Sequence, residues 1–164
     1  MRNSLVIVRS TIALLTVSTG LVEAAPGEPG HNHAVFAAGT PGDPGKPARI
    51  VEIRMHETGD GRMLFTPDRV VVARGEQIQF VLKNAGNVDH EFMLDSVANN
   101  ARHRVAMTKS PDMEHDDPNG RHLDPDESSE IMWRFTKAGT FEFACLIPGH
   151  YESGMRGTIV VEPR

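Results

Sequence analysis

The chain has 164 residues, which is enough for one domain with a hydrophobic core and too few for a multidomain oxidase. It carries 22 acidic and 17 basic residues, a net charge of −5 with histidine neutral, and its Lys and Arg residues form no cluster. We therefore expect neither a nucleic acid nor an anionic membrane surface as a partner. Cys145 is the only cysteine, so the chain cannot form an internal disulfide.

Residues 1–24 have the layout of a secretory signal peptide. The basic residues Arg2 and Arg9 come before an apolar stretch over residues 11–22, and small residues begin at Ala24. The apolar stretch is well short of the ~20 residues that a membrane-spanning helix needs. We therefore predict that residues 1–24 are cleaved, that the protein is exported, and that it does not insert into a membrane afterwards.

Residues 25–47 are rich in Pro and Gly and contain few bulky apolar side chains. Such a composition predicts a flexible leader outside the folded domain, which would then span residues 48–164. The leader contains two histidines, His31 and His33.

From Ala48 onward, short runs of alternating apolar and polar residues are separated by turn residues, a pattern typical of β-strands. The predicted inward faces are Val51, Ile53 and Met55; Ile78, Phe80 and Leu82; His90, Phe92 and Leu94; Ile131, Trp133 and Phe135; and Phe141, Phe143 and Cys145, with further strands at 70–72 and 157–162. We predict an all-β fold, a Greek-key β-sandwich of about seven or eight mostly antiparallel strands. The polar interval 96–127 is expected to hold a long loop or a short helix near 97–107.

One segment near the C-terminus carries three side chains that bind soft metals. Cys145, His150 and Met155 follow one another at intervals of five residues, at the end of a predicted strand and in the turn after it. A loop of this length can surround a metal ion from three sides. Gly149 and Gly154 stand directly before the histidine and the methionine, where a tight reversal can require backbone conformations that other residues resist.

This donor set points to copper. Two His, one Cys and a weak axial Met make the blue-copper arrangement, so a second histidine is required. His90 is the best candidate, because it begins an inward strand face that a neighbouring strand can bring to the loop. Taken singly, Cys145 could be inert core, Met155 a core filler and His150 a surface residue. Their joint spacing favours copper, and a structural zinc site is disfavoured because zinc sites rarely use Met.

The segment from Cys145 to Met155 resembles the copper-binding loop of the cupredoxins, the family of plastocyanin, azurin and rusticyanin, and the resemblance covers roughly residues 48–164. It implies that His90, Cys145 and His150 are the equatorial ligands of one copper and that Met155 is the axial ligand. Together with the sequence around His90, the loop is most similar to the CopI-type periplasmic cupredoxins linked to bacterial copper tolerance. The resemblance therefore implies a periplasmic protein that binds copper and could cycle it between Cu+ and Cu2+.

Additional Met and His residues suggest a weak secondary copper site. Our candidates are Met107, Met113 and His115 in the polar interval, with His31 and His33 in the leader. Thioether and imidazole groups suit Cu+ and Cu2+ respectively. The alternative is that these side chains only decorate solvated segments.

Two functions would use the same primary site. The first is copper tolerance, with copper ions as ligands and a redox protein, a copper exporter or an oxidase as protein partners. The second is diffusible one-electron transfer, with electrons entering at the edge of His150 beside Leu146, Ile147 and Pro148. We do not expect an enzyme, because a dinuclear centre needs a second cysteine and the copper oxidases need further His clusters and another domain. A cuprous oxidase side activity stays open.

Overall fold

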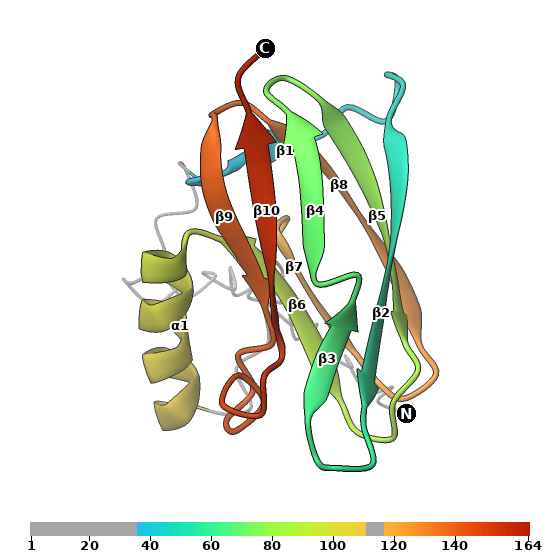
Figure 1. The fold of residues 1–164 in the computed structure, drawn as a ribbon, viewed down its shortest axis with the longest axis vertical. Helices are drawn as coiled ribbons and strands as arrows, with labels where there is room; N and C mark the ends of the chain where they lie inside the picture. The colour runs from blue at the N-terminus through green and yellow to red at the C-terminus, as the bar shows by residue number, and fades with distance from the viewer. Residues whose placement is uncertain (1–35, 111–116) are drawn as a thin grey trace, which may run out of the picture. The chain divides into compact units, whose positions relative to one another are not determined.

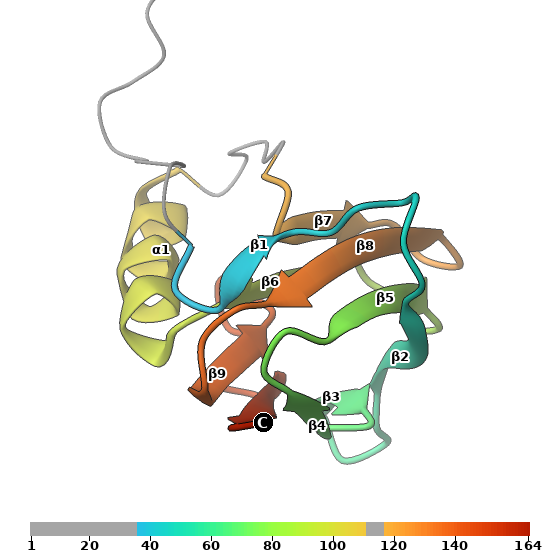
Figure 2. The same ribbon diagram turned by 90° about the horizontal axis from the view of Figure 1, so that it is seen from above.

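The computed structural model describes residues 36–110 and 117–164, which form a two-layer β-sandwich with a helix beside it (Figures 1 and 2). Each layer is a sheet of five strands, in the orders β1-β8-β5-β2-β3 and β4-β10-β9-β6-β7. The first sheet consists of β1 (Gly39–Pro41), β2 (Arg49–Glu57), β3 (Met63–Thr66), β5 (Gln77–Asn84) and β8 (Ser128–Phe135). The second consists of β4 (Arg69–Ala73), β6 (His90–Asp95), β7 (Gly120–Leu123), β9 (Gly139–Ala144) and β10 (Arg156–Glu162).

The predicted all-β sandwich is confirmed, although the described residues contain ten strands rather than seven or eight. The additional strands are β1, β3 and β7, which have only three or four residues each. All three lie at the edges of their sheets. Segments this short contain too few residues to show an alternating pattern, and pairing with a longer neighbour defines them. Two strand pairs, β2 with β5 and β4 with β10, are parallel, and the other pairs are antiparallel as expected.

The inward side chains of both sheets form one hydrophobic core. Its aromatic centre is made by Phe65, Phe92 and Phe143, each no more than 2% exposed. The rings of Phe92 and Phe143 stack with centroids 5.3 Å apart, and the ring of Phe65 meets that of Phe143 edge-on at 5.1 Å. These side chains come from both layers, so the stack fixes one sheet against the other.

The sandwich begins earlier in the chain than the expected start at Ala48. Strand β1 pairs with β8, and the ring of Phe36 meets that of Trp133 edge-on at 5.1 Å. At Gly39, which has φ of +152°, a Cβ atom would lie 2.0 Å from the carbonyl oxygen of Arg134. The residues between 36 and 47 thus include a paired edge strand inside the range expected to be a leader. A Gly-Thr-Pro strand has no apolar alternation, so its pairing was not visible in the sequence.

Helix α1 (Val97–Lys109) occupies the interval for which a long loop or a short helix was expected. It begins after Ser96, whose hydroxyl accepts a hydrogen bond from the backbone N–H of Asn99 at 3.2 Å and so caps the first turn. The helix lies alongside β6 and β9 (Figure 1). Its buried residues are Asn100 and Met107. The helix agrees with the expected position near 97–107. Because it buries so few side chains, its amphipathic pattern is weak, which explains why a loop stayed open as the alternative.

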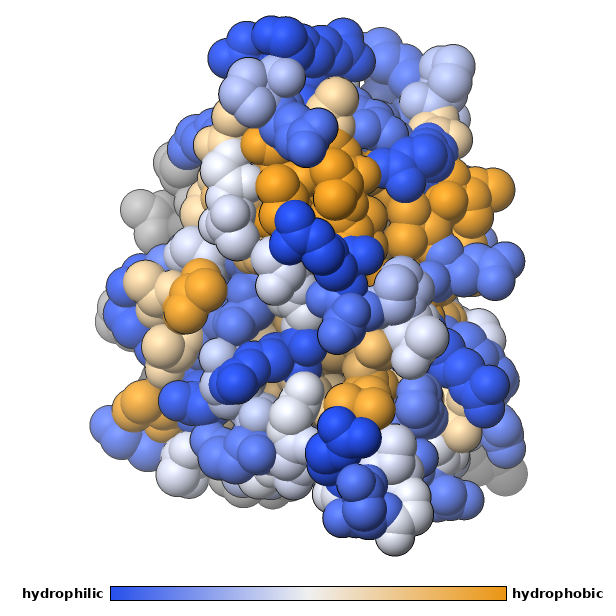
Figure 3. All heavy atoms as spheres, in the orientation of Figure 1, coloured by the Kyte–Doolittle hydropathy of each residue, from blue (hydrophilic) through white to orange (hydrophobic). Residues whose placement is uncertain are grey.

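The surface of the sandwich is mostly hydrophilic in the view of Figure 3, with an apolar area over its upper part. Strands β2 and β4 each carry an exposed apolar side chain, Ile50 and Val71. No helix in residues 36–110 or 117–164 is long and apolar enough to cross a membrane.

Candidate metal centre

Three of the four predicted ligands, His90, Cys145 and His150, come together at one end of the sandwich, and the backbone of Met155 joins them there. Cys145 directly follows β9, and His150 and Met155 lie in the loop that leads to β10. His90 begins β6, which pairs with β9 in the same sheet. The neighbouring strand therefore brings His90 to the loop, as the sequence predicted.

The loop is closed by its own backbone hydrogen bonds. The N–H of Cys145 donates to the carbonyl of Met155, and the N–H of Met155 donates to the carbonyl of His150, each at 3.1 Å. Gly149 and Gly154 have φ of +91° and +102°, which confirms the expectation that these positions need left-handed backbone. The loop thus holds its three metal-binding residue types in a tight reversal.

Three ligand-type atoms face one another at this end. Cys145 Sγ lies 3.3 Å from His150 Nδ1, and His90 Nδ1 also lies 3.3 Å from His150 Nδ1. All three atoms lie within 4.8 Å of one another. The side chains of His90, Cys145 and Met155 are fully buried, whereas His150 is partly exposed. The group is therefore closed except at the edge of His150.

The spacing of these atoms fits a single first-row metal ion. With metal–nitrogen and metal–sulfur bonds of about 2.0 and about 2.3 Å, three donors in a triangle around an ion lie about 3.5–3.7 Å apart. The observed separations of 3.3 Å are slightly shorter. Two imidazole nitrogens and one sulfur form a donor set that suits copper. His90, Cys145 and His150 could therefore hold copper with little rearrangement.

Burial sets the protonation of the sulfur. Burial raises the pKa of the Cys145 thiol to about 12, although a hydrogen bond from the backbone N–H of Glu91 to Sγ at 3.3 Å acts in the opposite direction. Because a metal binds the thiolate, metal binding must release this proton. Burial also raises the pKa of the Glu91 carboxyl to about 7. One oxygen of that carboxyl accepts the backbone N–H of Leu146 at 3.0 Å, which ties β6 to the loop.

The second ring nitrogen of His90 contacts a carboxylate that the sequence analysis did not single out. His90 Nε2 lies 2.8 Å from Glu57 Oε1. Burial lowers the pKa of His90, and the Glu57 carboxylate acts in the opposite direction. Burial also lowers the pKa of His150. For Glu57 itself, burial raises the pKa, but hydrogen bonds, led by the one from the Asn87 backbone, together outweigh it, so the pKa is lowered.

A signal for Glu57 was present in the sequence. Val51, Ile53 and Met55 alternate on the inward face of β2, and Glu57 is the next residue in that series. A carboxylate at an inward position needs a polar partner. The partner could not be identified because it lies 33 positions away in the chain.

Of the secondary copper candidates, only Met107 lies in the described part of the chain. Met107 belongs to α1 and is buried on the face of the helix that packs against the sheet, in a small apolar cluster with Met93, Ala144 and Leu146. The other candidates, His31, His33, Met113 and His115, lie outside the described residues. A different exposed group of ligand-type side chains lies beside the start of β6 and the end of β7: Asp89, His122 and Asp124.

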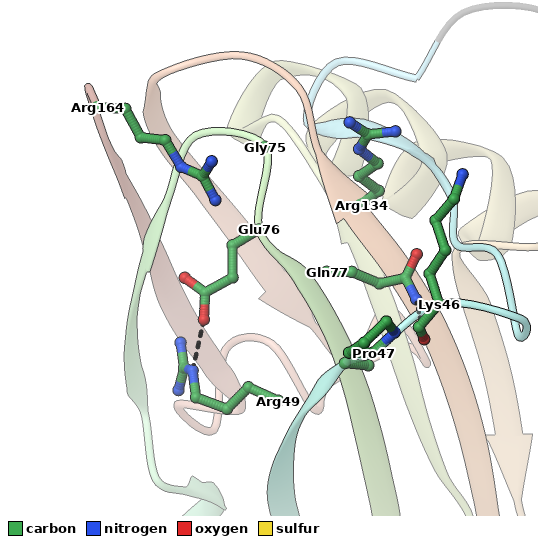
Figure 4. Close-up of a pocket in the computed structure, with 9 residues that line it drawn as sticks. Lys46, Pro47, Arg49, Gly75, Glu76, Gln77, Arg134 and Arg164 are labelled. Atoms are coloured by element: carbon green, nitrogen blue, oxygen red, sulfur yellow. Dashed lines mark hydrogen bonds and ion pairs between the residues drawn. The ribbon is translucent and has the colours of Figure 1, made fainter.

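A hollow lined by charged residues lies at the other end of the sandwich (Figure 4). Lys46, Arg49, Arg134 and Arg164 surround it, and Arg49 forms an ion pair with Glu76 at 2.6 Å. Strand β2 begins at this hollow with Arg49 and ends with Glu57 beside His90. A strand of nine residues spans about 25–30 Å, so the hollow is separate from the metal-binding group.

Comparisons with known proteins agree with this geometry. Residues 52–162 match the family described as copper binding proteins of the plastocyanin/azurin family. The chain is 42% identical over 160 residues to the copper-resistant cuproprotein CopI of Rubrivivax gelatinosus, across 91% of this chain and 94% of that protein. It is 37% identical over 149 residues to the protein of the same name from Pseudomonas aeruginosa, across 73% and 82% of the two chains. Among solved structures, auracyanin B matches with a TM-score of 0.61 and 24% identity, across 78% of this chain and 99% of that chain.

A β-sandwich that gathers two imidazoles and a thiol at one end defines a copper-binding protein of the cupredoxin class. The chain belongs to the plastocyanin/azurin family of copper-binding proteins. The predicted similarity to CopI-type cupredoxins is also confirmed, by an identity of 42% over most of the chain. One detail of the predicted route for electron entry was wrong. Leu146 is fully buried, so it cannot belong to an exposed apolar surface beside His150.

Proposed function

We propose that this cupredoxin binds one copper ion through His90, Cys145 and His150, with Met155 as the axial ligand, and that it serves copper tolerance. The observation that carries the proposal is the mutual approach of Cys145 Sγ, His150 Nδ1 and His90 Nδ1 within 4.8 Å in a closed end of the sandwich. Met155 is assigned to the same set because its side chain is fully buried and its backbone carbonyl accepts the N–H of Cys145 at 3.1 Å. The names of the CopI relatives, which are called copper-resistant cuproproteins, support the tolerance role.

Copper bound here would supply a one-electron exchange between Cu+ and Cu2+. The residues of the chain limit how far the ligands can move during that exchange. Cys145 receives a hydrogen bond from the N–H of Glu91, and its own N–H is bonded to Met155. His90 is packed at full burial and held at its outer nitrogen by Glu57. Because these bonds restrain the ligands, the site can accept both oxidation states with little rearrangement.

The setting of this function is the periplasm. The signal-like segment 1–24 and the similarity to copper-resistant cuproproteins support export. Copper ions are the ligand. In this setting the protein passes copper or electrons to a redox protein, a copper exporter or an oxidase. We propose that the protein binds copper rather than acting as an enzyme. A cuprous oxidase side activity would come in addition to copper binding and would not replace it.

The test is a visible and paramagnetic-resonance spectrum of the copper-loaded protein. Wild type should show an intense thiolate-to-copper charge-transfer band, and Cys145→Ser should lose it because the chain has no other thiol. The matched control is Glu152→Gln, which changes an exposed residue of the same loop and should keep the band. A band that survives in Cys145→Ser would refute the site.

A second function, diffusible electron transfer, is favoured by one observation. His150 is the only one of the four proposed ligands that is partly exposed, and Ile147 and Pro148 lie in the same loop at the surface. An electron could therefore enter through the edge of His150. The copper sensitivity of a deletion strain separates the two functions. Deletion of a tolerance protein should make the strain sensitive to copper. Deletion of an electron carrier should leave copper tolerance unchanged and impair a respiratory or photosynthetic reaction.

A further inference from the structure

Glu57 occupies an unusual position for a carboxylate. It is the last residue of β2 and follows the inward residues Val51, Ile53 and Met55 of that strand. Its side chain is only 20% exposed. A carboxylate taken from water into such a place costs free energy unless hydrogen bonds compensate it. The position therefore calls for an explanation beyond strand pairing.

The turn that leads into β6 is shaped around this carboxylate. The backbone N–H of Asn87 donates to Glu57 Oε2 at 2.9 Å, and Asn87 Nδ2 donates to the same oxygen at 3.3 Å. At Gly86, a Cβ atom would lie 2.3 Å from Glu57 Oε1. Glycine is thus required for the carboxylate to sit where it does. The other oxygen, Oε1, is left to face His90 Nε2 at 2.8 Å.

The contact with His90 determines which ring nitrogen carries the hydrogen. An ionised carboxylate can only accept hydrogen bonds, so Nε2 of His90 must be the donor. In a neutral imidazole the other nitrogen then has a free lone pair. That nitrogen, Nδ1, is the one that lies 3.3 Å from His150 Nδ1, in the group with Cys145 Sγ. The carboxylate therefore selects the tautomer that presents a lone pair to the metal-binding group.

We propose that Glu57 is the positioning residue of the copper centre: it fixes the tautomer and the ring orientation of His90, and its negative charge favours Cu2+ over Cu+. This inference rests on the proposed function, in which His90 is a copper ligand. A carboxylate behind a metal-bound imidazole also makes the ring a stronger electron donor. Both effects stabilise the more highly charged ion, so Glu57 lowers the reduction potential of the centre.

The first experiment compares the reduction potentials of copper-loaded variants. Glu57→Gln removes the charge but keeps an oxygen that can accept the hydrogen of Nε2. We expect the ratio of Cu+ to Cu2+ affinity to rise about tenfold, which for one electron is about 59 mV. Asp89→Asn is the matched control, because it removes a carboxylate next to His90 that is 56% exposed and screened by water. The reduction potential of Asp89→Asn should shift much less than that of Glu57→Gln. Equal shifts in the two variants would overturn the proposal.

The second experiment separates the hydrogen bond from the charge. Gly86→Ala keeps Glu57 but places a methyl group where the carboxylate lies, so the carboxylate must move away from His90. In the metal-free protein, nitrogen-15 NMR should show His90 as the Nε2–H tautomer in wild type and as a mixture in Gly86→Ala. A single unchanged tautomer in Gly86→Ala would overturn the positioning role.

The two proposals fail in different ways. If copper-loaded wild type lacks the thiolate-to-copper band, the proposed copper site itself is wrong. If the band is present in wild type and in Glu57→Gln, but the potential of Glu57→Gln equals that of wild type, only the role of Glu57 is wrong. Circular dichroism of each variant confirms that it is folded before either comparison is made.

Discussion

Gly157 is the position in the second sheet where an added methyl group should be most damaging. It lies directly opposite Phe143 in the pairing of β10 with β9. A Cβ atom there would lie 2.1 Å from Phe143 Cζ and 2.8 Å from the carbonyl oxygen of Asp68. Phe143 cannot easily give way, because it is fully buried and stacked on Phe92 with centroids 5.3 Å apart. We therefore expect Gly157→Ala to destabilise the fold by overpacking.

The magnitude follows from the type of clash. Overpacked core substitutions cost about 1–3 kcal/mol. Both a locked aromatic ring and a backbone oxygen oppose the new methyl group, so we expect the upper part of that range, about 3 kcal/mol. With a urea dependence of about 1.5 kcal/mol/M, the unfolding midpoint should fall by about 2 M.

The measurement is urea unfolding of the metal-free protein, because bound copper would stabilise the fold by mass action. Gly59→Ala is the matched control: a Cβ atom there meets nothing within 4 Å, and the free energy of unfolding should change by less than about 1 kcal/mol. Adding Phe143→Leu to Gly157→Ala should recover part of the loss, because the two positions are in contact. Equal midpoints for Gly157→Ala and Gly59→Ala would show that the core can absorb the methyl group and would refute the packing argument.

Three further predictions concern the proposed metal site and the helix. Met155→Leu should keep copper bound but raise its reduction potential, since the axial ligand tunes the potential; a lower potential by voltammetry would mean that Met155 is not axial. Titration of the full-length chain with copper should saturate above one equivalent if the additional Met and His residues bind copper, and saturation at a single equivalent would remove the secondary site. Ser96→Ala should cost about 1 kcal/mol in urea unfolding, because the first turn of α1 loses its cap, whereas Thr108→Ala near the other end should cost less. An unchanged unfolding midpoint for Ser96→Ala would mean that the cap contributes nothing to the free energy of unfolding.

Much of the site was predictable because its chemistry is concentrated in one short segment. Cys145, His150 and Met155 lie within eleven residues, and each bears a donor that copper accepts. The inward alternation of β6 pointed to His90, and the structure places its ring next to that of His150. The assignment of these four residues as the ligands stays a prediction until a copper-loaded spectrum is measured.

The environment of those residues was not predictable, because it depends on contacts between distant parts of the chain. Glu57 meets His90 across 33 positions, and the backbone of Glu91 meets Cys145 across 54 positions. Neither pair has a spacing that a local pattern could reveal. Helix α1 was expected near 97–107, but a loop stayed open as the alternative, because the buried face of the helix consists of Asn100 and Met107 rather than an apolar stripe.

The strand periodicity, the β-sandwich class and the cluster of soft donors in the last loop could all be predicted from the sequence, because each is a local property of side-chain type and spacing. Three features could be seen only in the folded chain: β1 pairs with β8 inside the expected leader, Met107 of α1 is buried in a cluster with Met93, Ala144 and Leu146, and a carboxylate contacts the outer nitrogen of His90. These features arise where strands pack side by side and layers face each other, and the order of residues along the chain does not encode that proximity locally.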